Sequence, residues 1–284
     1  MSIVIENLSY IYKKNTPLER EALKNINLKI EAGEFVGIIG HTGSGKTTLV
    51  QHLNGLLKPT SGRVMINGID TRSRDIKSLR RNVGVIFQYP EHQLFEETVY
   101  KDIAFGLVKL GLSRTEIDER VKKAAATVGL PANVLEVSPF ELSGGQKRRV
   151  AIAGVAVMDP EILVMDEPTA GLDPRGRDEL CEYITRLHRE SGKILIIVSH
   201  SMEDVAKLVN RVVVMAKGEI VMDAPPGEVF MKTGLLESIG LSAPQITYFM
   251  KKLKKDIPAL RDDIFTVKEA ADEIYRLIRS KSNK

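Results

Sequence analysis

The sequence is poor in cysteine and has no long apolar run. Its single cysteine, Cys181, excludes an internal disulfide and favours a reducing compartment such as the cytoplasm. Residues 1–10 contain neither a basic segment nor a long apolar stretch, so we expect no signal peptide. The longest apolar runs, such as 194–198 and 212–216, are far shorter than a membrane span. Any membrane role is therefore expected to be peripheral and to depend on partner proteins.

The sequence also lacks a strong charge of either sign. Its 41 lysine and arginine residues exceed its 37 aspartate and glutamate residues by four, and the excess is spread along the chain. Such a mild positive charge permits an acidic ligand or an anionic surface but demands neither. Aromatic residues make up only 5% of the chain. No basic segment interleaved with aromatic residues is evident, so we expect no nucleic-acid partner.

Apolar residues, in contrast, make up 43% of the 284 residues, which is enough for a large core. Three segments in a turn-rich N-terminal region predict antiparallel strands, at 3–8, 22–30 and 63–66. Four apolar runs predict buried parallel strands separated by helices, at 35–39, 83–87, 162–165 and 194–198. The pattern indicates an α/β fold with an N-terminal antiparallel β subdomain.

Two regions are expected to be helical. Between Pro90 and Val157 no strand pattern occurs, which indicates an inserted α-helical subdomain over about 90–157. Within it, Ser113 and Glu116 can form a capping box for a helix over 114–128. Past the turn at 225–227 the pattern is helical again. We therefore expect one main domain over 1–240 and a C-terminal helical extension over 241–284.

The last helix of this extension carries an apolar stripe. Thr266 and Glu269 form a second capping box at its start. The stripe consists of Val267, Ala270, Ala271, Ile274, Leu277 and Ile278. It either packs on its own domain or binds a partner, and the sequence leaves both alternatives open.

A phosphate-binding loop follows the strand at 35–39. Residues 40–47, GHTGSGKT, match the pattern GxxxxGK[ST] in full, between an apolar strand and a helix. Lys46 would supply a cation to the β- and γ-phosphates, and Thr47 a hydroxyl to Mg²⁺. The sequence thus predicts ATP and Mg²⁺ as ligands on a P-loop NTPase (RecA-like) core. The expected ATP contacts are Gly40, His41, Thr42, Gly43, Ser44, Gly45, Lys46, Thr47 and Thr48, although the side chain of His41 has no assigned chemistry.

Four further candidates for catalysis or metal binding come after predicted parallel strands. Asp166 is placed to hold Mg²⁺, and Glu167 to orient and deprotonate the attacking water. Because one acid would suffice for the metal, the second argues for hydrolysis. His200 follows the strand at 194–198, so it reaches the same sheet edge and can hydrogen-bond the γ-phosphate. Gln88 has an amide that can ligate Mg²⁺ or water and report nucleotide state to the helical subdomain.

A second element suited to binding phosphate lies about a hundred residues after the phosphate loop. LSGGQ, at 142–146, opens an apolar helix. Together with the phosphate loop, Gln88, the acid pair, GLD at 171–173 and His200, in that order, it resembles the nucleotide-binding domain of ATP-binding cassette (ABC) proteins over about residues 3–225. The resemblance implies that each subunit closes over the ATP of the opposite one. The residues implied are Ser143, Gly144, Gly145 and Gln146, with Asp173 near the interface.

The same resemblance implies that Tyr12 stacks on the adenine, with Tyr10 as the alternative. The stretch QYPEHQLFEETV, at 88–99, is similar to the energy-coupling factor (ECF) branch of ABC importers, and to its A-prime ATPase rather than to the sister. In that branch the segment after Gln88 contacts a membrane subunit. A vitamin or transition-metal importer at the cytoplasmic face of the cell membrane is implied. The implied partners are a paralogous ATPase, in a heterodimer rather than a homodimer, a transmembrane coupling protein and a membrane substrate-binding protein.

Other classes of ABC ATPase compete with this interpretation. The chain could serve another class of ABC transporter. DNA-repair and chromosome-maintenance ATPases separate the phosphate loop from LSGGQ by long coiled coils, whereas fewer than a hundred residues separate Lys46 from Ser143 here. ATPases that act as translation factors carry two cassettes in tandem, whereas this chain carries one set of motifs. The spacing of the motifs therefore favours a transporter subunit.

Overall fold

A computed structural model describes residues 1–73 and 76–282. A six-stranded sheet forms the centre of the fold. The strand order is β10-β9-β3-β8-β7-β6, with parallel pairing except between β9 and β10. The strands are β3 (Phe35–Ile39), β6 (Val83–Ile86), β7 (Ile162–Asp166), β8 (Ile194–Val198), β9 (Arg211–Ala216) and β10 (Glu219–Ala224). The four predicted parallel strands are confirmed. β9 and β10 were not among the predicted strands, although the apolar run at 212–216 lies in β9.

A smaller antiparallel sheet packs against one face of this central sheet. Its order is β2-β1-β4-β5, built from β1 (Ser2–Tyr12), β2 (Arg20–Glu31), β4 (Ser61–Ile66) and β5 (Ile69–Asp70). Successive side chains of a strand point to opposite faces. Val36 and Ile38 of β3 accordingly join β1 and β2 in one core cluster, whereas Phe35 and Ile39 join the helices on the other face. The predicted N-terminal β subdomain is thus part of the α/β fold.

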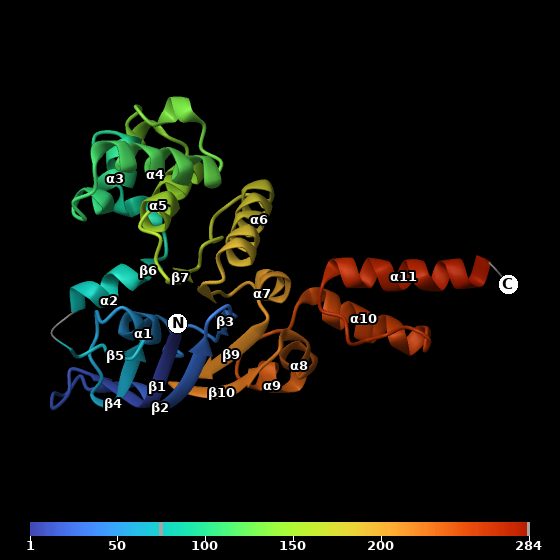
Figure 1. The fold of residues 1–284 in the computed structure, drawn as a ribbon. Helices are drawn as coiled ribbons and strands as arrows, with labels where there is room; N and C mark the ends of the chain where they lie inside the picture. The colour runs from blue at the N-terminus through green and yellow to red at the C-terminus, as the bar shows by residue number, and fades with distance from the viewer. Residues whose placement is uncertain (74–75, 283–284) are drawn as a thin grey trace.

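The helical subdomain stands beyond the β6 end of the sheet in Figure 1. It contains α3 (Val99–Val108), α4 (Arg114–Thr127) and α5 (Gly144–Ala156), and no strand lies between residues 90 and 157. The capping box of α4 is formed: Ser113 Oγ accepts from the Glu116 N–H at 3.3 Å, and Glu116 Oε2 accepts from the Ser113 N–H at 3.0 Å. Other helices border the sheet, namely α1 (Lys46–Leu53), α2 (Ile76–Asn82), α6 (Pro174–Ser191) and α7 (Met202–Leu208).

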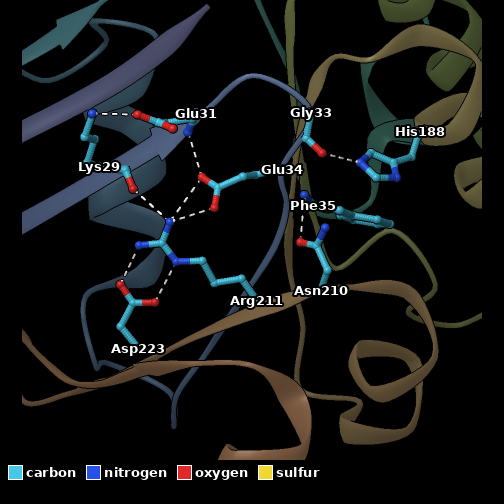
Figure 2. Close-up of polar contacts among 9 residues, drawn as sticks. All are labelled: Lys29, Glu31, Gly33, Glu34, Phe35, His188, Asn210, Arg211 and Asp223. Atoms are coloured by element: carbon cyan, nitrogen blue, oxygen red, sulfur yellow. Dashed lines mark hydrogen bonds and ion pairs between the residues drawn. The ribbon is translucent and has the colours of Figure 1, made fainter.

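Polar contacts hold the turn between β2 and β3 (Figure 2). Arg211, the first residue of β9, donates to Asp223 of β10 at 2.7 Å and to Glu34 of the turn at 3.0 Å. From the other side, His188 of α6 hydrogen-bonds the Gly33 carbonyl at 2.9 Å. A bidentate guanidinium fixes orientation as well as distance. These contacts therefore set where β3, and the loop that follows it, begin.

The C-terminal extension packs partly on itself. It follows α8 (Pro226–Met231) and α9 (Thr233–Ser238), and it contains α10 (Gln245–Asp256) and α11 (Val267–Ser282). Met250, Leu260, Ile264 and Ala270 form a small separate core. Leu241 and Ala243 belong to the main core instead, and the division at residue 240 stays a prediction. No helix among the described residues has both the length and the apolar character to cross a bilayer.

The predicted apolar stripe of α11 is divided between two environments. Ala270 is buried, and Ile274 and Leu277 pack against the same small core. Val267 and Ile278 are 65% and 56% exposed. The Thr266 capping box is formed, because Thr266 Oγ1 accepts from the Glu269 N–H at 3.2 Å and Glu269 Oε2 from the Thr266 N–H at 3.0 Å. Part of the stripe thus packs on its own domain, and part is exposed.

Candidate functional site

The phosphate loop joins β3 to α1 in a backbone path that requires glycine. Gly45 caps α1 with φ of 106°, and a Cβ there would lie 2.7 Å from the Ala22 carbonyl oxygen. A Cβ on Gly40 would lie 2.4 Å from the Met215 carbonyl oxygen. Glycine is therefore needed for both conformation and close packing. Within the loop, Lys46 Nζ donates to the Gly40 carbonyl at 2.7 Å. Burial lowers the pKa of Lys46, although the neighbouring carboxylates oppose this shift.

One cavity of about 500 Å³ brings most of the predicted nucleotide residues together. The residues predicted from the sequence that line this cavity are Tyr12, Thr42, Gly43, Gly45, Lys46, Thr47, Thr48, Gln88, Asp166, Glu167 and His200. Gly40, His41 and Ser44 do not line it. Ser44 is fully buried, and the His41 ring hydrogen-bonds the adjacent Thr42 carbonyl at 2.6 Å. Parallel strands end at one edge of the sheet, which explains why these separate segments meet.

Asp166, the last residue of β7, faces the phosphate loop across the cavity. Thr47 Oγ1 donates to Asp166 Oδ2 at 3.5 Å, and Gln88 lines the same cavity. Burial raises the pKa of Asp166, whereas Lys46 lowers it. A hydroxyl, a carboxylate and an amide are oxygen donors of the kind that Mg²⁺ prefers. The three residues therefore fit a magnesium site beside the phosphates.

Glu167 is held in a costly conformation beside His200. Its φ is 52°, a rare value for a residue with a side chain, and its N–H donates to the Val198 carbonyl at 2.9 Å. Its Oε1 lies 3.5 Å from His200 Nε2 and has no hydrogen-bond partner among the described residues. Burial, followed by repulsion from Asp166, raises the pKa of Glu167 to about 7. A carboxylate of that pKa is suited to accept a proton near neutral pH.

The imidazole of His200 is kept neutral more readily than that of an ordinary surface histidine. Burial and the nearby Lys46 cation lower the pKa of its imidazole. The imidazole is therefore neutral at neutral pH, and its contact with Glu167 is no ion pair. A neutral imidazole offers one N–H donor and one acceptor nitrogen. His200 can thus donate to an anionic oxygen in the cavity.

The aromatic candidate Tyr12 lies at the cavity, whereas Tyr10 does not line it. The Tyr12 hydroxyl shares a hydrogen bond with Thr48 Oγ1 at 3.1 Å. Tyr10 lies behind it, edge-on to the Tyr12 ring at 4.7 Å between centroids and against His52 at 4.8 Å. Arg20 also lines the cavity because the β1–β2 register pairs it with Tyr12. Sequence reasoning missed Arg20, since only the strand register brings it there.

The LSGGQ residues lie in a different cleft, away from the phosphate loop. Ser143 caps α5: its Oγ accepts from the Gln146 N–H at 3.3 Å, and Gln146 Oε1 accepts from the Ser143 N–H at 3.1 Å. A Cβ on Gly144 or Gly145 would meet nothing within 4 Å. Neither has a positive φ. The chain itself therefore does not require glycine at these positions, which leave room for close approach from outside.

Asp173 borders the same cleft as the LSGGQ residues. This cleft, of about 820 Å³, is lined by Ser143, Gly145, Gln146 and Asp173 among others, and none of the cavity residues named above lines it. Asp173 caps α6, with its Oδ1 accepting from the Gly176 N–H at 2.8 Å. The structure thus divides the predicted residues into two groups on one chain.

Arg148 connects several parts of the site and was not predicted. It is 3% exposed and donates to Glu91 through Nε at 3.0 Å and through its terminal nitrogen at 2.8 Å. It also donates to the carbonyls of Pro168 and Ala170, in the turn after the acids. Burial opposes ionisation of Glu91, but the bonds from Arg148 outweigh it and lower the pKa of Glu91. The sequence KRR, at 147–149, shows a basic cluster but does not show which of its two arginines is buried.

The segment after Gln88 forms an exposed apolar surface. Pro90 opens a short helix, η1 (Pro90–Gln93). Tyr89 and Phe95 are 46% and 58% exposed, and the Phe95 ring lies edge-on to Phe105 of α3 at 4.9 Å. Exposed aromatic side chains gathered in this way are typical of a protein-binding surface. The segment is therefore a candidate docking site.

Comparison with known proteins adds independent information. Residues 23–170 match the family model described as ABC transporter. The energy-coupling factor transporter ATP-binding protein EcfA2 of Acetivibrio thermocellus is 61% identical, over 98% of this chain and 99% of the relative. The protein of the same name from Clostridium tetani is 54% identical, over 99% of both.

Solved structures agree with the sequence relatives. The structure of cbiO1 from Clostridium perfringens, described as part of the ABC transporter complex cbiONQ, superposes with a TM-score of 0.75 at 39% identity. The alignment covers 88% of this chain and 98% of that one. A dimeric post-hydrolysis state of the ATP-binding cassette MJ0796, bound to ADP and Pi, gives a TM-score of 0.72 at 30% identity. That alignment covers 79% of this chain and 98% of the cassette.

Proposed function

This chain belongs to the ABC transporter family, and we propose that it is the ATP-hydrolysing subunit of an energy-coupling factor importer. One observation carries the proposal: the phosphate loop, the acids and His200 share one cavity, whereas LSGGQ of the same chain lines another. A single chain therefore holds two incomplete halves. Two subunits placed head to tail would complete both sites.

The main residues of the cavity have distinct roles in the proposed hydrolysis. Lys46 and the loop amides bind the phosphates, and Tyr12 stacks on the adenine. Glu167 accepts a proton from the attacking water, and His200 donates to the γ-phosphate. Thr47, Gln88 and Asp166 would hold Mg²⁺, which offsets the charge of the β- and γ-phosphates when bound. Burial keeps these groups in a medium of low dielectric, where such interactions are strong.

The opposite subunit would supply the cap of each site. Ser143 and the first amides of α5 form a helix N-terminus, where the positive end of the helix dipole favours an anion. Open space around Gly144 and Gly145 supports this close approach. ATP would then join the two subunits. Loss of the γ-phosphate on hydrolysis would remove these contacts and let the dimer open.

The proposed assembly contains several proteins. The two sequence relatives described above are both named EcfA2, and the number in that name supports pairing with a paralogous ATPase rather than with a second copy of this chain. The A-prime type is proposed from the likeness of residues 88–99. Tyr89 and Phe95 would contact a transmembrane coupling protein, which places the chain peripherally at the cytoplasmic face of the cell membrane. A membrane substrate-binding protein would select the vitamin or transition-metal ion. No nucleic-acid partner is included.

The variant Glu167→Gln tests the proposal. It keeps the phosphate contacts but removes the proton acceptor, so we expect turnover to fall by roughly 100- to 10,000-fold while ATP still binds. ATP should then convert the chain into a stable dimer, alone or mixed with its paralogue. ATPase assays measure the turnover, nucleotide titration measures ATP binding, and light scattering measures dimer formation.

Two further variants serve as controls. Lys46→Ala should bind no ATP and form no dimer. Ser143→Arg, added to Glu167→Gln, should bind ATP but remain monomeric, because its long side chain blocks the approach of the second subunit. Normal turnover of Glu167→Gln would contradict the role of Glu167. A dimer formed despite Ser143→Arg would contradict the composite site.

A further inference from the structure

A buried carboxylate outside the cavity joins three elements of the site. Asp204, in the first turn of α7, is 1% exposed. Its Oδ2 accepts from Thr169 Oγ1, in the turn after the acids, at 2.8 Å. Arg177 of α6 donates from Nε to both carboxylate oxygens, at 2.8 and 3.0 Å. A buried carboxylate is stable only when paired and hydrogen-bonded. Asp204 therefore ties the acid turn, α6 and α7 together.

The same arginine also contacts the residue next to His200. A terminal nitrogen of Arg177 donates to Ser201 Oγ, which accepts in addition from the Asp204 N–H at 3.2 Å. The Ser201 N–H in turn donates to Ser199 Oγ at 3.0 Å. His200 thus lies between two serines that are held by this network. The His200 ring in turn lies beside Glu167, with 3.5 Å between His200 Nε2 and Glu167 Oε1.

At its other end, the network reaches the start of α6. The Arg177 N–H donates to the carbonyl of Asp173, the N-cap of that helix, at 2.9 Å. Asp173 borders the cleft of the LSGGQ residues, which the second subunit would contact. Arg177 therefore lies in the first turn of α6, next to the expected interface, and its guanidinium links this turn to Asp204 and to the segment that carries His200. Only arginine has the rigid fork that reaches a carboxylate and a hydroxyl together.

We propose that Arg177 is a positioning residue for ATP hydrolysis, because it fixes His200 and Glu167 relative to the N-terminus of α6. Contact of the second subunit with Asp173 would then set the two catalytic side chains against the γ-phosphate. The inference rests on the proposed function. Arg177 does not line the nucleotide cavity, so its loss changes the geometry of hydrolysis and leaves ATP binding intact.

The test compares Arg177→Met with Arg189→Met in the full-length chain. Arg189 lies on the same helix, is exposed, and is close to the opposite end. We expect Arg177→Met to lower kcat by roughly 10- to 100-fold, the cost of a misplacement of about 1 Å, with KM and the Kd for ATP changed less than about twofold. Arg177→Lys should recover part of kcat. Arg189→Met should match the wild type.

Thermal unfolding of each variant distinguishes positioning from a structural role. A kcat loss that matches the loss of folded protein, with no recovery in Arg177→Lys, would overturn the proposal, as would an unchanged kcat. If Arg177→Met does not fold, Arg177→Lys provides the test by itself. A kcat below that of the wild type in this variant supports the proposal, and a wild-type kcat overturns it. A wild-type chain without ATPase activity, both alone and mixed with its paralogue, would refute the proposed function and this inference together.

Discussion

At the scale of single residues, Glu167 combines features that each oppose stability. Its backbone lies in the left-handed region, its side chain is buried, and one oxygen has no hydrogen-bond partner among the described residues. Such features cost free energy and persist where the surrounding structure holds them. Here β7, β8 and the His200 segment hold the residue. The same burial that costs stability raises the pKa of Glu167 to about 7.

This raised pKa predicts a stability that depends on pH. Between pH 4.5 and 7 the unfolded chain ionises Glu167 while the folded chain keeps the proton, so the wild type loses stability as pH rises through this window. Glu167→Gln does not titrate. Without nucleotide, we expect it to be more stable than the wild type by about 3 kcal/mol at pH 8, and equally stable near pH 4. Denaturant unfolding at both pH values measures the difference, and a difference independent of pH would contradict the assignment.

At the scale of elements, the ion pair of Arg148 with Glu91 connects η1, α5 and the turn after the acids. The side chains of Arg148 and Glu91 are 4% and 16% exposed, so water screens the pair weakly. The pair lies between the segment proposed to contact the membrane subunit and the catalytic acids. Movement of η1 would therefore displace Arg148, and with it α5 and the turn that follows Asp166 and Glu167.

The burial of this pair predicts a specific stability pattern. Arg148→Met leaves Glu91 with an uncompensated buried charge, and we expect it to cost about 3–5 kcal/mol of unfolding free energy. The double variant Arg148→Met with Glu91→Leu should recover most of that loss. The control is Arg149→Met, whose side chain is 26% exposed in its pair with Glu179, and which should cost less. Equal losses in the single and double variants would show that the charge is not the cause.

At the scale of the whole molecule, the C-terminal extension is set apart from the nucleotide cavity. Figure 1 shows α10 and α11 projecting from the α8 side, away from the helical subdomain. The extension has its own small core, and none of its residues lines the cavity. It still contributes to the main body, because Phe265 lies against Phe230 at 6.2 Å between ring centroids.

Truncation after Ala243 should therefore separate stability from binding. We expect the Kd for ATP to change by less than about threefold, which corresponds to less than 1 kcal/mol. The thermal midpoint should fall, because Phe230 loses the cover of Phe265. Nucleotide titration and thermal unfolding measure the two effects. A large loss of ATP affinity would show that the extension shapes the cavity after all.

Much of the site was predictable because its chemistry is local in the sequence. The phosphate loop, Asp166, Glu167 and His200 each follow a strand, and parallel strands place such residues at one edge. The same logic missed β9 and β10, since the run at 212–216 has no motif after it. The roles of the site residues remain predictions.

The amino-acid sequence by itself determined the motifs, the α/β class and the likeness to ABC ATPases, because backbone preference, apolar periodicity and capping act over a few neighbouring residues. Only the tertiary structure decided that Arg20 lines the cavity, that Arg148 pairs with Glu91 and that Arg177 reaches Ser201. The physical reason is distance along the chain. Long side chains find partners through strand register and helix packing, which no local pattern encodes.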